Sequence, residues 1–226
     1  MDEHSVMFLT KFSFFLVLFV LCPLDSGSRS RCSAQMTDNY APSPAPQSSY
    51  MFSEADALYN VVSYSGLTSP PYISSSFCDG QPSLNSITIT CSNTIGPDNE
   101  WHIIEITMTS VTLDGCIHPD ITKLIYLQTL DLSDNQLHDS IPSNLGDLSH
   151  LTTLDLSSNQ LTGTIPLSLG NLKNLTRLEL DQNFLTGIIP PSLGNLSSLE
   201  NLYLDDNELN GTLPKELGNL RNLGSL

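Results

Sequence analysis

The stretch LTTLDLSSNQLTGTIPLSLGNLKN, residues 151–174, decides the fold, because its pattern recurs on both sides of it. Residues 127–150, 175–198 and 199–222 place leucines at the same positions, so the step of the repeat is 24 residues. A fixed step of this length predicts a solenoid, in which each repeat forms one coil that stacks on the next. One asparagine recurs in every repeat: Asn135, Asn159, Asn183 and Asn207.

Each repeat carries a short strand followed by a sharp turn. In Leu154-Asp155-Leu156 the alternation predicts that the leucines point inward and that Asp155 points outward. Stacked strands of this kind form a parallel sheet in front of a leucine core. The asparagine comes where the turn leaves backbone groups without partners in the sheet, and an inward amide both donates and accepts hydrogen bonds. The pattern therefore predicts a buried ladder of asparagines.

The return side of each repeat is equally regular. Ile-Pro and Leu-Gly pairs recur in phase, and a further shared position holds Gly163, Gly187 and Gly211, with Asp139 as the exception. We expect the prolines to fix bends and the glycines to allow tight or left-handed backbone. The form Leu-Thr-Gly-x-Ile-Pro-x-x-Leu-Gly-Asn-Leu resembles the plant-type extracellular leucine-rich repeat over residues 125–226. The resemblance implies an α/β solenoid: a right-handed leucine-rich-repeat superhelix with a concave parallel β-sheet and a small N-terminal helical cap.

A degraded repeat precedes the regular ones. Val111 takes the position of the asparagine and His118 that of the proline, while apolar residues keep the leucine positions: Ile103, Ile106, Met108 and Leu113. Terminal repeats are expected to be atypical, because one side faces a cap. At the other end the chain stops at Leu226, one strand into a new repeat, and we expect a truncated gene model, a fragment or a degenerate copy of something longer. The expected organisation is a signal peptide in 1–34, a flexible linker in 35–50, a cap in 51–100 and about five repeats in 101–226, the last one incomplete.

The N-terminus indicates export. The run FSFFLVLFVLC, residues 12–22, has the length of a signal-peptide core and is too short to span a bilayer. Small residues follow at the candidate cleavage positions Ser26, Ser28 and Ala34, and an uncleaved signal anchor is the alternative. Three Asn-x-Ser/Thr sequons fall in the repeats and predict glycosylation in the secretory pathway at Asn174, Asn195 and Asn210, although an Asn/Ser/Thr-rich repeat also produces sequons by accident.

The cap is expected to open with a helix. Ser53 precedes Glu54-Ala55-Asp56-Ala57-Leu58 as a helix N-cap would, and these residues resemble the opening helix of the plant-type cap. That family follows the helix with a cysteine pair that encloses a tryptophan. The corresponding pair here is Cys78 and Cys91, which implies a disulfide, although the spacing is wider and Trp101 lies outside it. Cys116 is left over, as a buried small side chain or as an intermolecular thiol.

The sequence lacks the motifs that bring catalysis or cofactor binding. It has no phosphate-binding glycine loop, no nucleophile elbow, no His-Glu-x-x-His and no Cys-x-x-Cys, so we expect no enzyme, no cofactor and no metal site. The histidines at 102, 118, 138 and 150 are interpreted as falling at unrelated phases of the repeat. The acidic side chains of a solvated sheet are interpreted as lacking the burial that tunes a catalytic acid.

The outward strand positions are where binding is expected. Twenty-four Asp and Glu against eight Lys and Arg give a net charge of −16, which disfavours nucleic acid and anionic membranes as partners. Polar residues on a solvated sheet need no function, but an acidic concave strip also fits a basic peptide or protein. The candidate partner-binding residues, with Arg177 and Tyr203 as anchors, are Asp131, Asp155, Arg177, Glu179, Asp181, Tyr203 and Asp205.

Two functions fit this sequence. The first is an extracellular ligand-recognition module, because the repeats resemble the start of the ectodomains of plant leucine-rich-repeat receptor kinases and receptor-like proteins. The second is a secreted inhibitor of a cell-wall-degrading enzyme, because the polygalacturonase inhibitors share this repeat and cap. A following transmembrane helix would favour the receptor, and a closing cap with cysteines would favour the inhibitor.

Overall fold

The computed structural model describes residues 86–92 and 102–225, together with Glu54, Ala57, Leu58, Val61, Val62 and Ser65. All of them belong to one of the two units of the chain, residues 42–226. The signal peptide, the linker and the start of the cap lie outside the described residues, so their boundaries stay predictions. No helix among the described residues combines the length and the apolar character that a membrane crossing requires.

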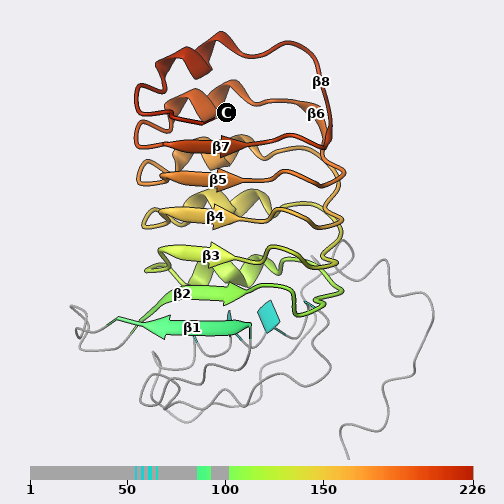
Figure 1. Cartoon of the computed structure of the whole chain (residues 1–226). Coiled ribbons are helices and arrows are strands. Elements are labelled where there is room, and N and C mark those ends of the chain that lie inside the picture. The colour runs from blue at the N-terminus through green and yellow to red at the C-terminus, as the bar shows by residue number, and fades with distance from the viewer. Residues whose placement is uncertain are drawn as a thin grey trace, which may run out of the picture. The chain divides into compact units, whose positions relative to one another are not determined.

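A six-stranded sheet forms one side of the solenoid (Figure 1). Its strands are β1 (Ile87–Cys91), β2 (Ile103–Met108), β3 (Thr129–Asp131), β4 (Thr153–Asp155), β5 (Arg177–Glu179) and β7 (Asn201–Tyr203). From β2 onward the strands are parallel, and each pairs with the strand one repeat away, so that Leu130 pairs with Leu154 and Leu154 with Leu178. The 24-residue step of the sequence is thus the register of the sheet.

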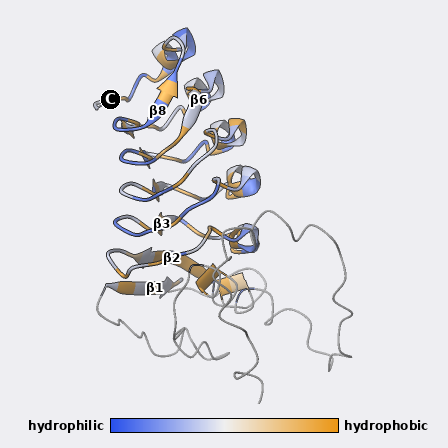
Figure 2. Ribbon diagram, turned by 90° about the vertical axis from the view of Figure 1, so that its right-hand side faces the viewer, coloured by the Kyte–Doolittle hydropathy of each residue, from blue (hydrophilic) through white to orange (hydrophobic). Residues whose placement is uncertain are grey.

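The opposite side consists of short 3-10 helices, as the view in Figure 2 shows. They are η4 (Pro119–Lys123), η5 (Ser143–Asp147), η6 (Leu167–Asn171), η7 (Pro191–Asn195) and η8 (Lys215–Asn219). The last four follow a proline at the N-cap, whose fixed φ sets the bend into the helix. A second, two-stranded parallel sheet joins β6 (Thr186–Ile188) and β8 (Glu208–Asn210) between the two sides. The fold class expected from the sequence is confirmed, with 3-10 helices forming the return side.

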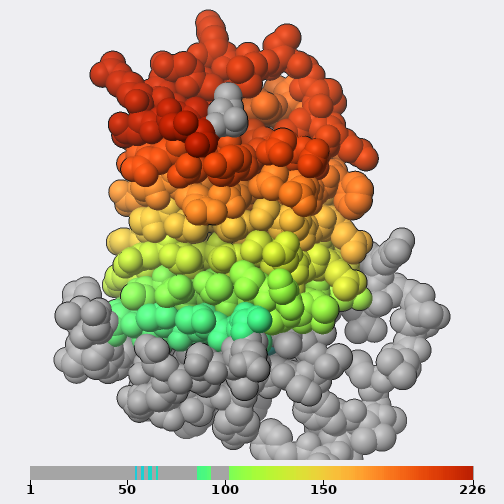
Figure 3. Space-filling view, in the orientation of Figure 1, coloured from blue at the N-terminus to red at the C-terminus, as the bar shows by residue number. Residues whose placement is uncertain are grey.

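The core is a continuous column of leucines between the two sides. Leu154, Leu178 and Leu202 of successive strands are fully buried, as are Leu169 and Leu193 of the helices. Each coil lies flat against the next, and the coils follow one another as bands in Figure 3. Neighbouring coils therefore bury each other's leucines, and one coil alone would expose them.

The asparagines form the ladder that the sequence predicts; Asn135, Asn159 and Asn183 are buried, and Asn207 is partly exposed. The Nδ2 group of Asn159 donates to the carbonyl oxygens of Leu132 (2.9 Å), Leu156 (3.2 Å) and Ser157 (3.0 Å). Its Oδ1 accepts the backbone N–H of Leu137 at 3.0 Å. Equivalent bonds surround Asn135, Asn183 and Asn207. One amide in each coil thus satisfies backbone groups of its own coil and of the preceding one.

The two glycine positions of the repeat are required for different reasons. Gly163, Gly187 and Gly211 have positive φ, and Asp139 adopts the same left-handed backbone at φ +66°, which short polar residues tolerate. The glycine of the Leu-Gly pair is needed for space instead. A Cβ added at Gly170 would lie 2.3 Å from the carbonyl oxygen of Ser192 in the next coil. The first position therefore has the expected left-handed backbone, and the second has no positive φ and is needed for the close approach of the next coil.

The N-terminal end of the sheet is closed by a strand that sequence analysis missed. β1 pairs antiparallel with β2 and buries Ile87 and Ile89, whose period-2 spacing was a signal for a strand. The degraded repeat forms β2 as expected. In the cap segment, Glu54, Ala57, Leu58, Val61 and Val62 are helical, as the resemblance implies.

Cys91 and Cys116 are both disulfide-bonded in this structure. Cys116 is 2% exposed, so the expectation of burial is right, but its sulfur is not a free thiol. Cys78, the partner that the resemblance implies for Cys91, lies outside the described residues, and that pairing stays a prediction.

Non-reducing peptide mapping of the secreted protein is expected to recover a fragment that joins Cys78 to Cys91. Because the bond closes a short loop, its removal should destabilise the cap by about 2–4 kcal/mol. Substituting both cysteines by serine and following thermal unfolding would measure this effect. A map in which Cys91 is joined to a different cysteine would show the pairing to be wrong.

Candidate functional site: the acidic sheet face

The candidate site is the solvent-facing side of β3, β4, β5 and β7, which we call the sheet face. The central leucine of each strand points into the core, so the residues on either side of it point outward. One outward row is Thr129, Thr153, Arg177 and Asn201, and the next is Asp131, Asp155, Glu179 and Tyr203. The register thus places three carboxylates and a tyrosine side by side on four neighbouring strands.

The two central carboxylates of this row are almost covered. Asp155 is 9% exposed and Glu179 8% exposed, although both lie on the outward side of the sheet. Strands in a sheet are about 4.8 Å apart, so side chains in register cover one another. The interpretation that carboxylates of this sheet lack burial is therefore wrong for these two residues.

Serine hydroxyls and backbone N–H groups fix the first two carboxylates. Oδ1 of Asp131 accepts the N–H of Ser133 at 3.1 Å and its hydroxyl at 2.7 Å. Oδ1 of Asp155 accepts the same two groups of Ser157 at 3.0 and 2.6 Å. The serine two residues after the aspartate thus orients each carboxylate, which the Asp-x-Ser spacing in the sequence signals.

Arg177 is the cation of the sheet face. Its Nε donates to Oε1 of Glu179 at 2.7 Å, and half of its side chain stays exposed. The hydrogen bond with Glu179 raises the pKa of Arg177 above its ordinary value, with further contributions from the charges of Glu179, Asp155 and Tyr203. The guanidinium therefore compensates one carboxylate and still presents donors to solvent.

Burial raises the pKa of two aspartates here. It raises the pKa of Asp155 above its ordinary 3.8, and the hydrogen bond and charge of Glu179 act in the same direction, while the bonds from Ser157 oppose it. Burial also raises the pKa of Asp181, with the charges of Asp205, Asp155 and Asp206 adding to it. Mutual repulsion on one face is the common cause after burial. A nearby positive charge would relieve this repulsion.

The expected binding residues all lie on this face or at its edge. Tyr203 stands beside Glu179 in the row of carboxylates and is half-buried. Asp181 comes two residues after the end of β5, and Asp205 comes two residues after the end of β7. The N–H of Gln182 donates to the carbonyl of Asp205 and so links the two coils at this point. The seven residues span four coils of one surface.

The three sequons lie away from the six-stranded sheet. Asn174 is exposed, and its Nδ2 donates to the carbonyl of Ser149 at 2.9 Å. Asn195 ends η7 and Asn210 ends β8, and both are exposed. Glycans at these positions, which stay a prediction, would leave the sheet face open.

A stacked column of rings was missed by the sequence analysis. His102 and Tyr126 stack with ring centroids 3.9 Å apart, and Tyr126 and His150 follow at 5.6 Å. Residues 102, 126 and 150 differ by the 24-residue step, so the interpretation that these histidines fall at unrelated phases is wrong for two of them. The shared position of the two histidines is not obvious in the sequence, because the repeat between them has Tyr126 at that position. Nδ1 of His102 also lies 2.9 Å from Oε1 of Glu54, which ties the cap helix to the first strand of the repeats.

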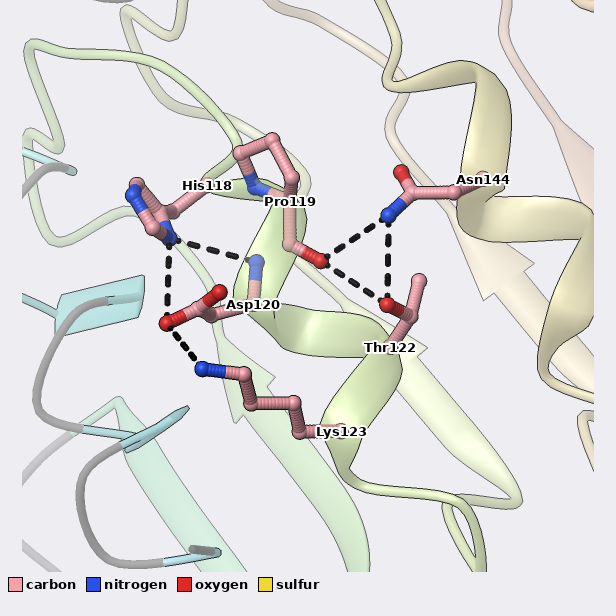
Figure 4. A network of polar contacts seen from close by, with 6 residues as sticks. All are labelled: His118, Pro119, Asp120, Thr122, Lys123 and Asn144. Carbon is pink, nitrogen blue, oxygen red and sulfur yellow. Dashed lines mark hydrogen bonds and ion pairs between the residues drawn. The ribbon is translucent and has the colours of Figure 1, made fainter. Parts of the chain in front are cut away.

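His118 shows how the degraded repeat replaces its proline (Figure 4). Its Nδ1 accepts the N–H of Asp120 at 3.2 Å, which caps η4, and Nζ of Lys123 binds the carboxylate of Asp120 at 2.8 Å. Asn144 of the next coil donates to the carbonyl of Pro119 at 3.3 Å. Burial lowers the pKa of His118, so the neutral ring that accepts this bond is favoured. The network has a structural role at the start of η4.

No group of three or more His, Cys, Asp or Glu side chains within the described residues could hold a metal ion. The carboxylates of the row lie in a line across the strands, and a metal ion requires ligands that converge on one point. The geometry supports recognition of a charged partner along the row.

A family model described as a leucine-rich repeat region matches residues 103–226. No curated protein matches the chain. Many solved structures are similar to it, among them the following three. PEPR1, in its crystal structure with AtPEP1, has 32% identity and a TM-score of 0.64, and the match covers 76% of this chain and 24% of that one. The ectodomain of the receptor kinase SOBIR1 from Arabidopsis thaliana has 27% identity and a TM-score of 0.63, over 76% of this chain and 90% of that one. A plant ice-binding protein has 31% identity and a TM-score of 0.61, over 76% and 53%.

Proposed function

We propose that this chain, which belongs to the leucine-rich-repeat family, is a recognition module of an extracellular protein and binds a basic peptide or protein on its sheet face. The observation that carries the proposal is the row of Asp131, Asp155 and Glu179 in register on neighbouring strands. Only one cation, Arg177, accompanies them on the described part of this face. A row of like charges at fixed spacing attracts and orients an opposite charge.

The relatives support recognition as the class of function. The chain is related to ectodomains of plant receptors, of which SOBIR1 is one. PEPR1 was crystallised with AtPEP1, and this chain matches about a quarter of the PEPR1 chain. The exported location, the signal peptide and the glycans at Asn174, Asn195 and Asn210 belong to the same proposal. They rest on the apolar run at residues 12–22, the three sequons and the relatives.

Tyr203 and Arg177 would give the row its specificity. Tyr203 continues the row of carboxylates and offers an aromatic ring and a hydroxyl beside Glu179. Arg177 offers free donors in the neighbouring row. A partner with a basic side chain and a nearby carbonyl or carboxylate would use both kinds of group, since rings and guanidinium groups dominate binding energy at interfaces.

The test uses the secreted full chain and a synthetic lysine-rich peptide as the probe. We expect binding that weakens as salt rises, because exposed charges are screened over about 8 Å at physiological ionic strength. The triple variant Asp131→Asn, Asp155→Asn, Glu179→Gln should slow association about tenfold and change dissociation less, because the lost charges act mainly on encounter. Surface plasmon resonance over a range of salt concentrations measures both rates.

A matched control separates the site from the total charge. The variant Asp114→Asn, Asp147→Asn, Glu216→Gln makes the same charge change away from the sheet face. Asp147 and Glu216 belong to η5 and η8 on the other side, and Asp114 lies outside the strands, 3.9 Å from His138. It should leave association near the original rate. Equal effects of the two triple variants would show that total charge, not the sheet face, drives binding. Inhibition of a cell-wall-degrading enzyme without peptide binding would favour the inhibitor function instead.

A further inference from the structure

Asp155 and Glu179 form a pair that the recognition of a cation does not by itself explain. They are Cα partners on β4 and β5, and both are more than nine-tenths buried. Adjacent strands are about 4.8 Å apart, so two carboxylates in register on them are close enough for mutual repulsion to matter in a poorly solvated site. A pair of this kind is relieved when one of its members binds a proton.

The surroundings decide which of the two takes the proton. Glu179 is compensated by Arg177, whose Nε lies 2.7 Å from Oε1. Within residues 102–225, Asp155 has no cation at ion-pair distance, and its Oδ1 accepts only the N–H and hydroxyl of Ser157. Asp155 is therefore the carboxylate whose charge is least compensated.

The other groups that face Asp155 do not change this assignment. Asp131 on β3 adds a like charge on one side, and Glu179 adds another on β5. Among the described residues Arg177 on β5 is the only nearby cation, and its attraction to Asp155 is weaker than its bond with Glu179. Asp181, which follows β5, and Tyr203 on β7 are the further titratable groups of the described part of the chain that face the pair.

We propose that in acidic solution Asp155 holds a proton that it shares with Glu179 in the unbound protein, and that this proton is released to solvent when a cationic ligand binds to the row. The protonated Asp155 donates its O–H to Glu179. When a ligand ammonium group takes the place of the proton, the O–H bond breaks, the proton leaves to water and the carboxylate pairs with the ammonium. The inference rests on the proposed function and adds a regulation of the same site.

The consequence is a binding affinity that depends on pH. Burial and Glu179 raise the pKa of Asp155 above its ordinary 3.8. Below the raised pKa the ligand has to displace the proton, which weakens binding. As pH rises through that pKa, binding tightens and then becomes constant once Asp155 is ionised.

The first test needs no ligand. Carbon-13 NMR of the side-chain carboxyl groups in the full chain should place the titration midpoint of Asp155 above 3.8. Glu179→Gln should lower that midpoint, because it removes the like charge, and Arg177→Gln should raise it, because it removes the nearby cation. A midpoint at or below 3.8 would overturn the proposal. If the titration midpoint of Asp155 moved in the same direction in both variants, the proposal would also be overturned, because the loss of an anion and the loss of a cation should have opposite effects.

The second test measures the released proton. Calorimetric titration with the lysine-rich peptide, in two buffers of different ionisation enthalpy near the NMR midpoint, should show release of up to one proton for each peptide bound. Asp155→Asn should abolish the release while the peptide still binds through the remaining carboxylates. Binding without proton release would overturn the coupling and leave the proposed function standing. Absence of peptide binding at every pH would overturn the proposed function and the coupling with it, and the NMR result would still decide whether the pair holds a proton.

Discussion

Replacing Gly170 with alanine is expected to destabilise the protein by about 3 kcal/mol, because the new Cβ has no space. It would lie 2.3 Å from the carbonyl oxygen of Ser192 and 2.7 Å from its carbonyl carbon. Both atoms belong to the backbone of the next coil, so they cannot move aside as a flexible side chain would. Two coils would have to separate, and the leucines between them would lose packing. Chemical denaturation of the full chain measures the loss.

Gly218 provides the matched control for this substitution. It holds the same position in η8, and no atom among the described residues lies within 4 Å of an added Cβ. Gly218→Ala should therefore change stability by less than about 1 kcal/mol and favour the folded state, because alanine restricts the unfolded chain. A loss at Gly218 as large as that at Gly170 would mean that both glycines are needed for backbone conformation and not for coil contact.

Replacing Asn159 with alanine should cost about 2–4 kcal/mol, since buried backbone groups left without a partner are expensive. The amide serves three carbonyl oxygens and one N–H of two coils, and Asn159 is 7% exposed, so water does not readily replace it. The loss should appear in the midpoint of denaturation by urea.

Two other asparagines calibrate this effect. Asn207 makes the same bonds but is partly exposed, so Asn207→Ala should cost less than Asn159→Ala. Asn171 lies exposed at the end of η6, and Asn171→Ala should change stability by less than about 0.5 kcal/mol. If all three substitutions had the same small effect, the ladder would not be a source of stability.

The repeats could be predicted because every coil needs the same residue types at the same positions. The leucines of β4 and β5 are buried by identical neighbours, and the position of Asn159 needs an amide in every coil. A requirement that recurs at a fixed step is visible in a single sequence. The degraded repeat with β2 was found in the same way, although Val111 replaces its asparagine.

The features that were missed depend on which unlike residues become neighbours, even where their positions follow the 24-residue step. β1 has no counterpart in the repeats, so the only signal for it in the sequence is the spacing of the apolar residues Ile87 and Ile89 at every second position. The burial of Asp155 and Glu179 depends on which side chains the adjacent coils place beside them. The stacking of His102 on Tyr126 depends on residues that differ in each coil. Contacts between unlike residues of successive coils leave no pattern in one sequence.

The register of the sheet sets a spacing rule for any extended ligand that crosses the strands. Successive carboxylates of the row, such as Asp131 and Asp155, are separated by one strand spacing, about 4.8 Å. An extended peptide places side chains on one side every second residue, about 6.8 Å apart. The strand spacing and the side-chain spacing of the peptide coincide again only after about three coils of the solenoid and four residues of the peptide. A straight peptide would therefore match the row at its ends and miss it in between, so that long flexible side chains such as lysine suit this surface better than short ones.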